Sequence, residues 1–202
     1  MNGKTVLYVS KNDKVIGFIE VYDAIKQTSK QAVSNLKELG VKTVILSGDD
    51  QKISDRVAKE IGADYSYGGV LPSDKAEIVK KYKEEGITVF IGDGVNDSPA
   101  LSVADVGVSM GGGTDIAVSS SDVIFMSNDL ISISKAIKTG RKTRKIIKEN
   151  LFWAFIYNVL GIPLACGVLY PLGILLNPMI ASLCMSLSSL FVVTNALRLY
   201  KD

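Results

Sequence analysis

The stretch Gly92-Asp93-Gly94-Val95-Asn96-Asp97 follows a run of strand-forming residues near the middle of a 202-residue chain. The apolar residues at 87–91 predict a buried parallel strand that ends at Asp93. Gly94 permits a tight turn, so Asp93 and Asp97 can project into one small space, with no cation nearby in the sequence. Two carboxylates suit Mg²⁺, which completes its octahedron with water and phosphate oxygens. The hexapeptide therefore favours metal-assisted phosphate chemistry, although Asp-Gly and Asn-Asp also occur in ordinary turns.

The sequence around this hexapeptide alternates strand and helix patterns. Strands are expected at 5–10, 15–21, 43–46, 63–65, 87–91, 106–109 and 122–126, and helices at 29–39, 51–61, 73–85, 98–103 and 114–118. The first two strands form a hairpin around 11–13. The remaining βα units predict an α/β fold with a doubly wound parallel sheet, which binds ligands at the carboxyl ends of its strands.

Two further elements point to a phosphate. Ser47-Gly48-Asp49 follows the strand at 43–46 and offers a hydroxyl and an amide-rich turn. Lys75 lies in the first turn of the helix at 73–85, where a cation opposes the helix dipole. Such a lysine is either an ordinary solvated side chain or one that neutralises a phosphate. The glycine-rich segment 110–114 is not followed by Gly-Lys-Ser/Thr, so we interpret it as a turn with a threonine helix cap.

Composition narrows the chemistry further. The formal net charge of +2 gives no reason to expect a nucleic-acid partner, and the absence of histidine removes the usual general base. The two cysteines, Cys166 and Cys184, lie in apolar sequence and do not predict a disulfide framework.

The C-terminal quarter of the chain is apolar. No Asp, Glu, Lys or Arg occurs from Asn150 to Leu197. Residues 151–170 would span about 30 Å as a helix, residues 172–197 are long enough to return, and Pro171 suits the turn. The sequence therefore predicts a transmembrane hairpin, with a helical pair buried in a soluble protein as the alternative. Basic residues flank both ends, which places both in the cytoplasm.

Polar side chains within a membrane span suggest function because they are costly there. Tyr157 and Asn158 lie near the centre of the first span, and Met185 and Ser189 lie one turn apart in the second. The thioether of Met185 favours Cu(I) over Zn²⁺ or hard cations. Helix packing alone, in which small residues and Met fill gaps, is the alternative.

Four of these segments resemble the motifs of a known family. Residues 92–101, Gly-Asp-Gly-Val-Asn-Asp-Ser-Pro-Ala-Leu, resemble the hinge signature of P-type cation-transporting ATPases, whose phosphorylation domain has the haloacid-dehalogenase fold. Residues 47–50 resemble the family's Thr-Gly-Asp-Asn, 71–75 resemble its lysine segment, and 110–115 also follow its pattern.

The resemblance implies roles for these residues. Asp93 and Asp97 would position Mg²⁺, and Asn96 would contribute to cofactor binding. Lys75 would neutralise the acyl-phosphate, and the Ser47 hydroxyl, in the loop with Gly48 and Asp49, would hydrogen-bond it. ATP would be the substrate. Asp50 replaces asparagine and adds a negative charge to the loop.

The apolar segment resembles the last two transmembrane helices of the copper(I) subgroup of heavy-metal P-type ATPases. The matching features are Tyr157-Asn158, Pro163-Leu164-Ala165, Met185-x-x-Ser188-Ser189 and the closing segment 195–199. By this resemblance Tyr157, Asn158, Met185 and Ser189 are candidate ligands of Cu(I), the cargo. Cys166 and Cys184 have no counterpart in the pattern.

Several of the family's motifs do not occur in these residues. The Asp-Lys-Thr-Gly-Thr phosphorylation loop, the His-Pro pair, Thr-Gly-Glu and Cys-Pro-Cys are all absent from the sequence. We therefore expect a C-terminal fragment that neither forms a phosphoenzyme nor pumps copper alone. Two other interpretations are a partner subunit that completes an ATPase with another chain, and a membrane-anchored haloacid-dehalogenase-like phosphatase. The phosphatase lacks an Asp-x-Asp nucleophile, since Asp23 has no second aspartate.

These interpretations divide the chain into five parts of a multi-pass cell-membrane protein. They are the end of a nucleotide-binding domain (1–14), the C-terminal part of the phosphorylation domain (15–128), a basic juxtamembrane helix (129–149) and two transmembrane helices (150–171 and 172–198). The expected partners are the bilayer, the copper ion, and the missing N-terminal part or a complementing chain.

Overall fold

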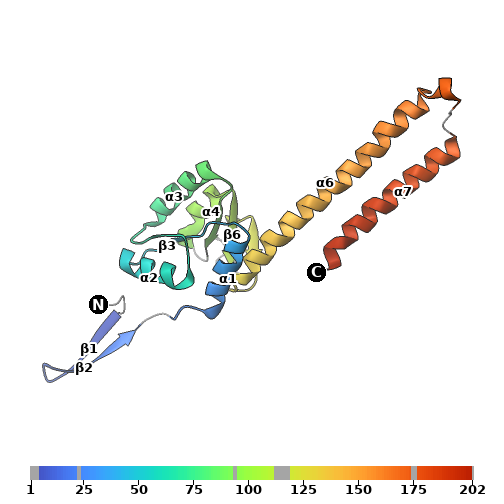
Figure 1. Ribbon diagram of the computed structural model, residues 1–202. Coiled ribbons are helices and arrows are strands. Elements are labelled where there is room, and N and C mark those ends of the chain that lie inside the picture. Colours follow the sequence, from blue (N-terminus) through green and yellow to red (C-terminus); the bar gives the residue numbers. More distant parts are fainter. Residues whose placement is uncertain (1–4, 22–23, 93–94, 112–118, 174–176, 202) are drawn as a thin grey trace. The chain divides into compact units, whose positions relative to one another are not determined.

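The computed structural model describes residues 5–21, 24–92, 95–111, 119–173 and 177–201. The chain forms two compact units, residues 1–134 and residues 135–202. Figure 1 shows an α/β unit and a pair of long helices, and each is considered by itself below. The five-part division expected from sequence stays a prediction.

The first element of unit 1 is an antiparallel hairpin of β1 (Thr5–Lys11) and β2 (Lys14–Val21). The intervening Asn12 and Asp13 have φ angles of 52° and 62°, as the tight turns that join twisted strands require. The hairpin expected from sequence is confirmed. Apolar side chains on it are exposed, among them Leu7, Val15 and Phe18.

Parallel strands form the body of unit 1. β3 (Val44–Leu46) pairs with β4 (Tyr65–Tyr67), and β5 (Val89–Gly92) pairs with β6 (Val106–Met110), which also pairs with β7 (Val123–Phe125). The parallel α/β character is confirmed. One continuous parallel sheet was expected, whereas the described parallel strands form two sheets, β3-β4 and β5-β6-β7. Within the described residues, β3 and β5 each pair with a strand on one side only.

Helices connect these strands: α1 (Gln27–Glu38), α2 (Gln51–Ile61), α3 (Pro72–Glu85) and α4 (Ser98–Val103). Their bounds agree with the predicted ones to within about one turn because the capping signals act locally. Gly62 ends α2 with a left-handed φ of 82°, and Pro72 opens α3. The expected helix at 114–118 lies outside the described residues.

Two strands begin two residues later than expected, at Tyr65 and Val89. For β4 the reason is that Asp64 serves a different purpose from strand pairing. Its carboxylate accepts hydrogen bonds from the Thr43 N–H (2.8 Å) and hydroxyl (3.0 Å) beside β3. Asp105 repeats the arrangement by accepting a bond from the Thr88 N–H (2.9 Å) beside β5. Aspartates thus brace the amino ends of the parallel strands.

Unit 2 contains most of α6 (Ile131–Ala165), which is 35 residues long and leads without a break from unit 1 into the apolar segment. After Ala165 the chain turns through Gly167, whose φ is 79°, and a 3₁₀ turn at Tyr170–Leu172. α7 (Pro178–Ala196) then runs back along α6, followed by a 3₁₀ segment, Leu197–Lys201 (Figure 1).

The two helices differ from the expected spans. The first ends five residues before Tyr170 because the left-handed Gly167 interrupts it. The second begins at Pro178, where the Asn177 side chain caps the Met179 N–H at 2.9 Å. None of the described helices combines the length and the apolarity needed to cross a membrane. The transmembrane hairpin is therefore unconfirmed and stays a prediction.

Candidate functional site

A nearly buried ion pair lies at the centre of the candidate phosphate site. Lys75 Nζ is 2.7 Å from Asp97 Oδ1, and the two side chains are only 17% and 12% exposed. The two residues are 22 positions apart, so the cation that pairs with Asp97 comes from a distant part of the sequence. Lys75 is placed in the first turn of α3, as predicted, and it is not an ordinary solvated lysine. Asp97 thus holds a nearly buried ammonium in a defined position.

The backbone around Gly92 determines where Asp97 sits. After β5 the chain forms a 3₁₀ turn, η1 (Val95–Asp97), that leads into α4. A Cβ atom added to Gly92 would lie 2.7 Å from the Asp97 Cβ, so this close approach requires glycine. Asn96 in the same turn is exposed. Asp93 and Gly94 lie outside the described residues, so the predicted pairing of Asp93 with Asp97 is untested.

The loop after β3 is held by its own hydrogen bonds. The Ser47 hydroxyl donates to Asp49 Oδ2 at 2.9 Å and accepts a bond from the Asp49 N–H at 3.1 Å. The Ser47 N–H donates to the carbonyl of Tyr67 at 2.9 Å, which extends the pairing of β3 with β4. These bonds hold the Ser47 hydroxyl just beyond the carboxyl end of β3.

The segment that precedes α3 connects this loop with the ion pair. The Val70 N–H donates to the Ser47 carbonyl at 3.0 Å, and Gly48 lies beside the Val70 carbonyl. Lys75 follows five residues later and bonds Asp97. The segment from Val70 to Lys75 thus connects the loop at the carboxyl end of β3 with the turn that follows β5, and carboxyl ends of strands are where an open α/β sheet binds ligands.

Asp50, which departs from the family pattern, has a clear structural function. It is the N-cap of α2, and its carboxylate accepts a hydrogen bond from the Lys52 N–H at 2.8 Å. A carboxylate at a helix N-terminus is favoured by the helix dipole. Its charge therefore stabilises α2, a capping function that the helix bounds alone could have predicted.

The carboxylate of Asp97 is a suitable ligand for Mg²⁺. Asp97 contributes a hard carboxylate oxygen, and one or two carboxylates with water and phosphate oxygens are what Mg²⁺ takes. Among the described residues no group of three or more His, Cys, Asp or Glu side chains gathers as a metal site. The residues fit a magnesium ion that is shared with a phosphate, rather than one enclosed by protein ligands.

The four candidate cargo ligands lie on α6 and α7. The Asn158 amide donates to the Ala154 carbonyl at 2.8 Å, and the Ser189 hydroxyl donates to the Met185 carbonyl at 3.3 Å. Each bond stays within one helix, and no hydrogen bond that the structure describes joins Tyr157 or Asn158 to α7. Met185 is 73% exposed. The predicted Cu(I) site stays untested.

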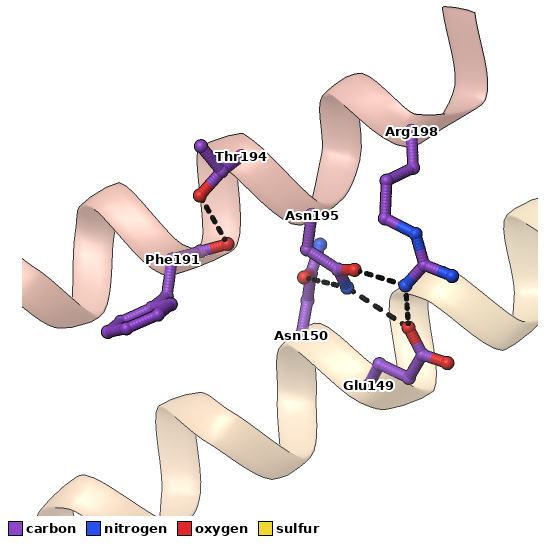
Figure 2. A network of polar contacts seen from close by, with 6 residues as sticks. All are labelled: Glu149, Asn150, Phe191, Thr194, Asn195 and Arg198. Atoms are coloured by element: carbon purple, nitrogen blue, oxygen red, sulfur yellow. Dashed lines mark hydrogen bonds and ion pairs between the residues drawn. The ribbon is translucent and has the colours of Figure 1, made fainter. Parts of the chain in front are cut away.

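A set of polar contacts that the sequence did not predict joins α6 to α7. We call Glu149, Asn150, Asn195 and Arg198 the polar clamp (Figure 2). Asn195 Nδ2 donates to Asn150 Oδ1 (2.9 Å) and Glu149 Oε2 (3.2 Å). Arg198 donates to Glu149 Oε2 (3.1 Å) and Asn195 Oδ1 (2.8 Å). Glu149 and Arg198 are the last and first charged residues around the uncharged segment, a signal that could have suggested their pairing.

Comparison with known proteins identifies the family. Residues 2–105 match the model of the haloacid dehalogenase-like hydrolases. The chain belongs to this family. It is also 48% identical over 200 residues to copper-transporting ATPase 1 of Rhizobium meliloti, and 45% identical over 194 residues to copper-exporting P-type ATPase B of Archaeoglobus fulgidus. These alignments cover 98% and 96% of this chain.

The chain spans about a quarter of the length of these relatives, 24% and 28% respectively. Among solved structures, a zinc-transporting PIB-type ATPase in its E2.Pi state superposes with a TM-score of 0.87 at 34% identity. That match covers 98% of this chain and 32% of the other. The likeness to P-type ATPases expected from the sequence is confirmed, and it extends through both units.

Proposed function

We propose that this chain forms the C-terminal part of a P-type ATPase that exports copper(I) at the expense of ATP. The observation that carries the proposal is the nearly buried Lys75–Asp97 pair beside the Ser47 loop, in a chain whose relatives are copper-transporting ATPases. Electrostatic stabilisation of a transferring phosphoryl group requires a cation and donors that are fixed in advance. The described site provides both.

Each residue has a defined role in this proposal. Lys75 neutralises charge on the phosphoryl oxygens, and the Ser47 hydroxyl turns from Asp49 to donate to one of them. Asp97 holds Mg²⁺ together with Asp93 and Asn96. The bound ion would supply charge neutralisation at the phosphate. When no phosphate is present, Asp97 keeps the Lys75 ammonium compensated and in position.

The unpaired edges of β3 and β5 support the proposal that a strand from outside this sequence completes the sheet. β3 and β5 each have one edge without a strand partner among the described residues, and the segment from Val70 to Lys75 connects the loop after β3 with Asp97 after β5. We propose that a parallel strand ending in Asp-Lys-Thr-Gly-Thr pairs with these edges and presents its aspartate to Lys75 and Ser47. The exposed hairpin of β1 and β2 fits this view, because an isolated two-stranded hairpin is only marginally stable in water.

The surface of unit 2 supports membrane insertion. Large apolar side chains on α6 and α7 are exposed, among them Phe152, Phe155, Val159, Leu160, Leu183, Leu190 and Phe191. Exposed apolar surface of this extent is typical of a membrane or protein contact. We propose that α6 and α7 form a transmembrane hairpin with both ends in the cytoplasm, and that Tyr157, Asn158, Met185 and Ser189 bind Cu(I) there. The thioether of Met185 and the absence of Asp and Glu between Asn150 and Leu197 favour Cu(I) over Zn²⁺.

Phosphorylation tests the catalytic part. With labelled ATP and Mg²⁺, the 202-residue chain alone should yield no acid-stable, hydroxylamine-labile phosphoenzyme. Co-expression with a polypeptide that carries the Asp-Lys-Thr-Gly-Thr loop should yield one. In that complex, Lys75→Met should lower phosphorylation at least about a hundredfold, the scale of a lost charge-stabilising donor. Lys80→Met, which removes an exposed lysine of the same helix, is the control. A phosphoenzyme formed by the chain alone would contradict the proposal.

Cu(I) binding tests the membrane part. Purified chain in detergent should compete with a chromophoric Cu(I) chelator, and Met185→Leu should weaken binding by about tenfold or more because a soft ligand is lost. Met179→Leu removes an exposed methionine from the same helix and should leave the affinity unchanged. Equal affinities of the two variants would exclude Met185 as a ligand.

A further inference from the structure

One face of α6 carries a dense row of cations. We call it the basic stripe, and its members are Lys135, Lys138, Arg141, Lys142, Arg144, Lys145 and Lys148. These seven cations fall within 14 residues, and six of them are exposed while Lys142 is half-buried. At 100° per residue all seven project from one half of the helix, and the other half holds the buried Ile146. The stripe is therefore a continuous positive surface.

Acidic residues are scarce in the segment that carries the stripe. Glu149 is the single acidic residue between positions 130 and 201. Its carboxylate is held by Arg198 at 3.1 Å and by Asn195 at 3.2 Å in the polar clamp (Figure 2). With one acidic residue against the seven cations of the stripe, the segment has a large net positive charge. An anionic ligand would complement it.

Aromatic side chains follow the stripe directly. Phe152, Trp153 and Phe155 are exposed on the next turns of the same helix, and the Trp153 ring lies 5.5 Å from that of Phe152 and 6.5 Å from that of Tyr157. Tryptophan and tyrosine concentrate at the headgroup level of bilayers, because their rings are apolar with one polar group. The order of cations, aromatics and uncharged residues along α6 marks a membrane surface near residues 148–153.

We propose that the basic stripe binds the headgroups of anionic phospholipids at the membrane surface. The proposal rests on the membrane placement proposed above and adds a lipid site to it. Lys and Arg next to a membrane span are attracted to anionic headgroups, and the attraction is additive over several cations. A bilayer fits better than an acidic protein because one continuous helix carries the stripe, the aromatics and the uncharged segment in that order. In this arrangement the lipid headgroups would lie beside the end of the stripe that precedes the aromatic residues.

The chain contains a reporter for this site, since Trp153 is its only tryptophan. The full chain is reconstituted in phosphatidylcholine bilayers, and a small fraction of lipid is replaced by brominated phosphatidylglycerol or brominated phosphatidylcholine. Bromine quenches a nearby indole, so the quenching of Trp153 measures which headgroup gathers there. Brominated phosphatidylglycerol should quench more strongly, and added salt should reduce the difference.

Matched variants locate the effect on the stripe. Lys138→Gln/Lys145→Gln/Lys148→Gln should reduce the preference for phosphatidylglycerol by about fivefold or more, the contribution of at least one cation. The corresponding three arginine substitutions should retain the preference. Lys30→Gln/Lys52→Gln/Lys59→Gln removes the same charge from exposed positions on α1 and α2 and should have no effect.

The outcomes separate this proposal from the proposed function. Equal quenching by the two brominated lipids, or an unchanged preference in the glutamine variant, would overturn the lipid site while leaving the membrane hairpin in place. An absence of quenching by either lipid would overturn both. A preference lost equally in the α1 and α2 variant would reduce the effect to net charge and would also overturn the site.

Discussion

The two units of this protein treat apolar side chains in opposite ways. Of the twelve apolar residues that are buried in the described part of the chain, eleven belong to unit 1 and only Ile146 belongs to unit 2. On α6 and α7, side chains such as Phe155, Leu160 and Leu190 are exposed. Unit 1 therefore buries apolar surface within itself, whereas unit 2 leaves most of its apolar surface exposed, as expected for the proposed membrane contact.

Polar contacts follow the same division. Unit 1 has them at the ends of its strands, where Asp64 and Asp105 brace amino ends and the Ser47 loop forms at a carboxyl end. Contacts between the helices of unit 2 gather at one end of the hairpin, in the polar clamp. Polar contacts in unit 1 thus lie at both ends of its parallel strands, and α6 and α7 are joined at one end.

The largest expected effect comes from a matched pair of leucines. Leu101 is 1% exposed in unit 1 and Leu160 is 65% exposed on α6. Leu101→Ala should lower the free energy of unfolding of unit 1 by about 2–5 kcal/mol, because it removes a buried side chain and leaves a cavity. Leu160→Ala should change the free energy by less than about 0.5 kcal/mol. Amide hydrogen exchange of the purified chain in mild detergent measures each unit separately. Comparable losses of unfolding free energy in both variants would contradict the difference in burial between Leu101 and Leu160.

Two glycines should respond with opposite signs. A Cβ added to Gly107 in β6 would lie 2.6 Å from the Leu101 carbonyl oxygen, and backbone there cannot move aside easily. Gly107→Ala should destabilise unit 1 by about 1–3 kcal/mol. A Cβ at Gly140 in α6 would meet no atom within 4 Å, so Gly140→Ala should stabilise the helix by about 0.5–1 kcal/mol. Thermal unfolding followed by circular dichroism tests both signs, and a stabilised Gly107→Ala variant would show that β6 and α4 are not closely packed.

Acid should act on unit 1 more than on unit 2. The hydrogen bond from the Thr43 N–H holds the pKa of Asp64 below its usual range, and the bond from the Thr88 N–H does the same for the pKa of Asp105. A carboxyl whose pKa is lowered by folding stabilises the fold above its unfolded pKa, and this stability is lost as pH falls through the folded pKa. Unit 1 should therefore lose stability below about pH 4.

Asp64→Asn should reduce this acid sensitivity, since the titrating group is removed. Asp13→Asn, in the turn between β1 and β2, is the control, because asparagine tolerates the positive φ of that position. Melting temperatures of unit 1 measured from pH 3 to pH 7 provide the comparison. An unchanged slope in Asp64→Asn would show that other carboxyls account for the acid sensitivity.

The smallest expected effect concerns the polar clamp. Glu149 and Arg198 are partly exposed, so a double-mutant cycle with Glu149→Gln and Arg198→Gln should give a coupling energy of about 0.2–1 kcal/mol. The exposed Glu77–Lys80 pair on α3 provides a reference cycle within one helix. Unfolding of the reconstituted chain measures both. A coupling near zero for Glu149 and Arg198 would show that the clamp does not hold α6 against α7.

Local patterns in the amino-acid sequence were enough to predict most helices and strands and the family. Helix bounds followed from local signals such as Pro72 and Gly62, because caps depend on neighbouring residues. The motif at 92–101 predicted a haloacid-dehalogenase fold by resemblance, and the family match agrees with that fold. These features are readable because each lies within a few consecutive residues.

Contacts between residues that are far apart in the sequence depend on the folded chain and could not be predicted. Lys75 bonds Asp97 across 22 positions, and Asn195 bonds Glu149 across 46. Neither contact follows from periodicity, which describes one element at a time, whereas strand register and the path of the connecting loops select the partners. The same reason explains why β4 begins at Tyr65, since the Asp64 carboxylate accepts a hydrogen bond from Thr43 beside the neighbouring strand β3. Local sequence thus specified the parts, and packing in three dimensions joined them into a site.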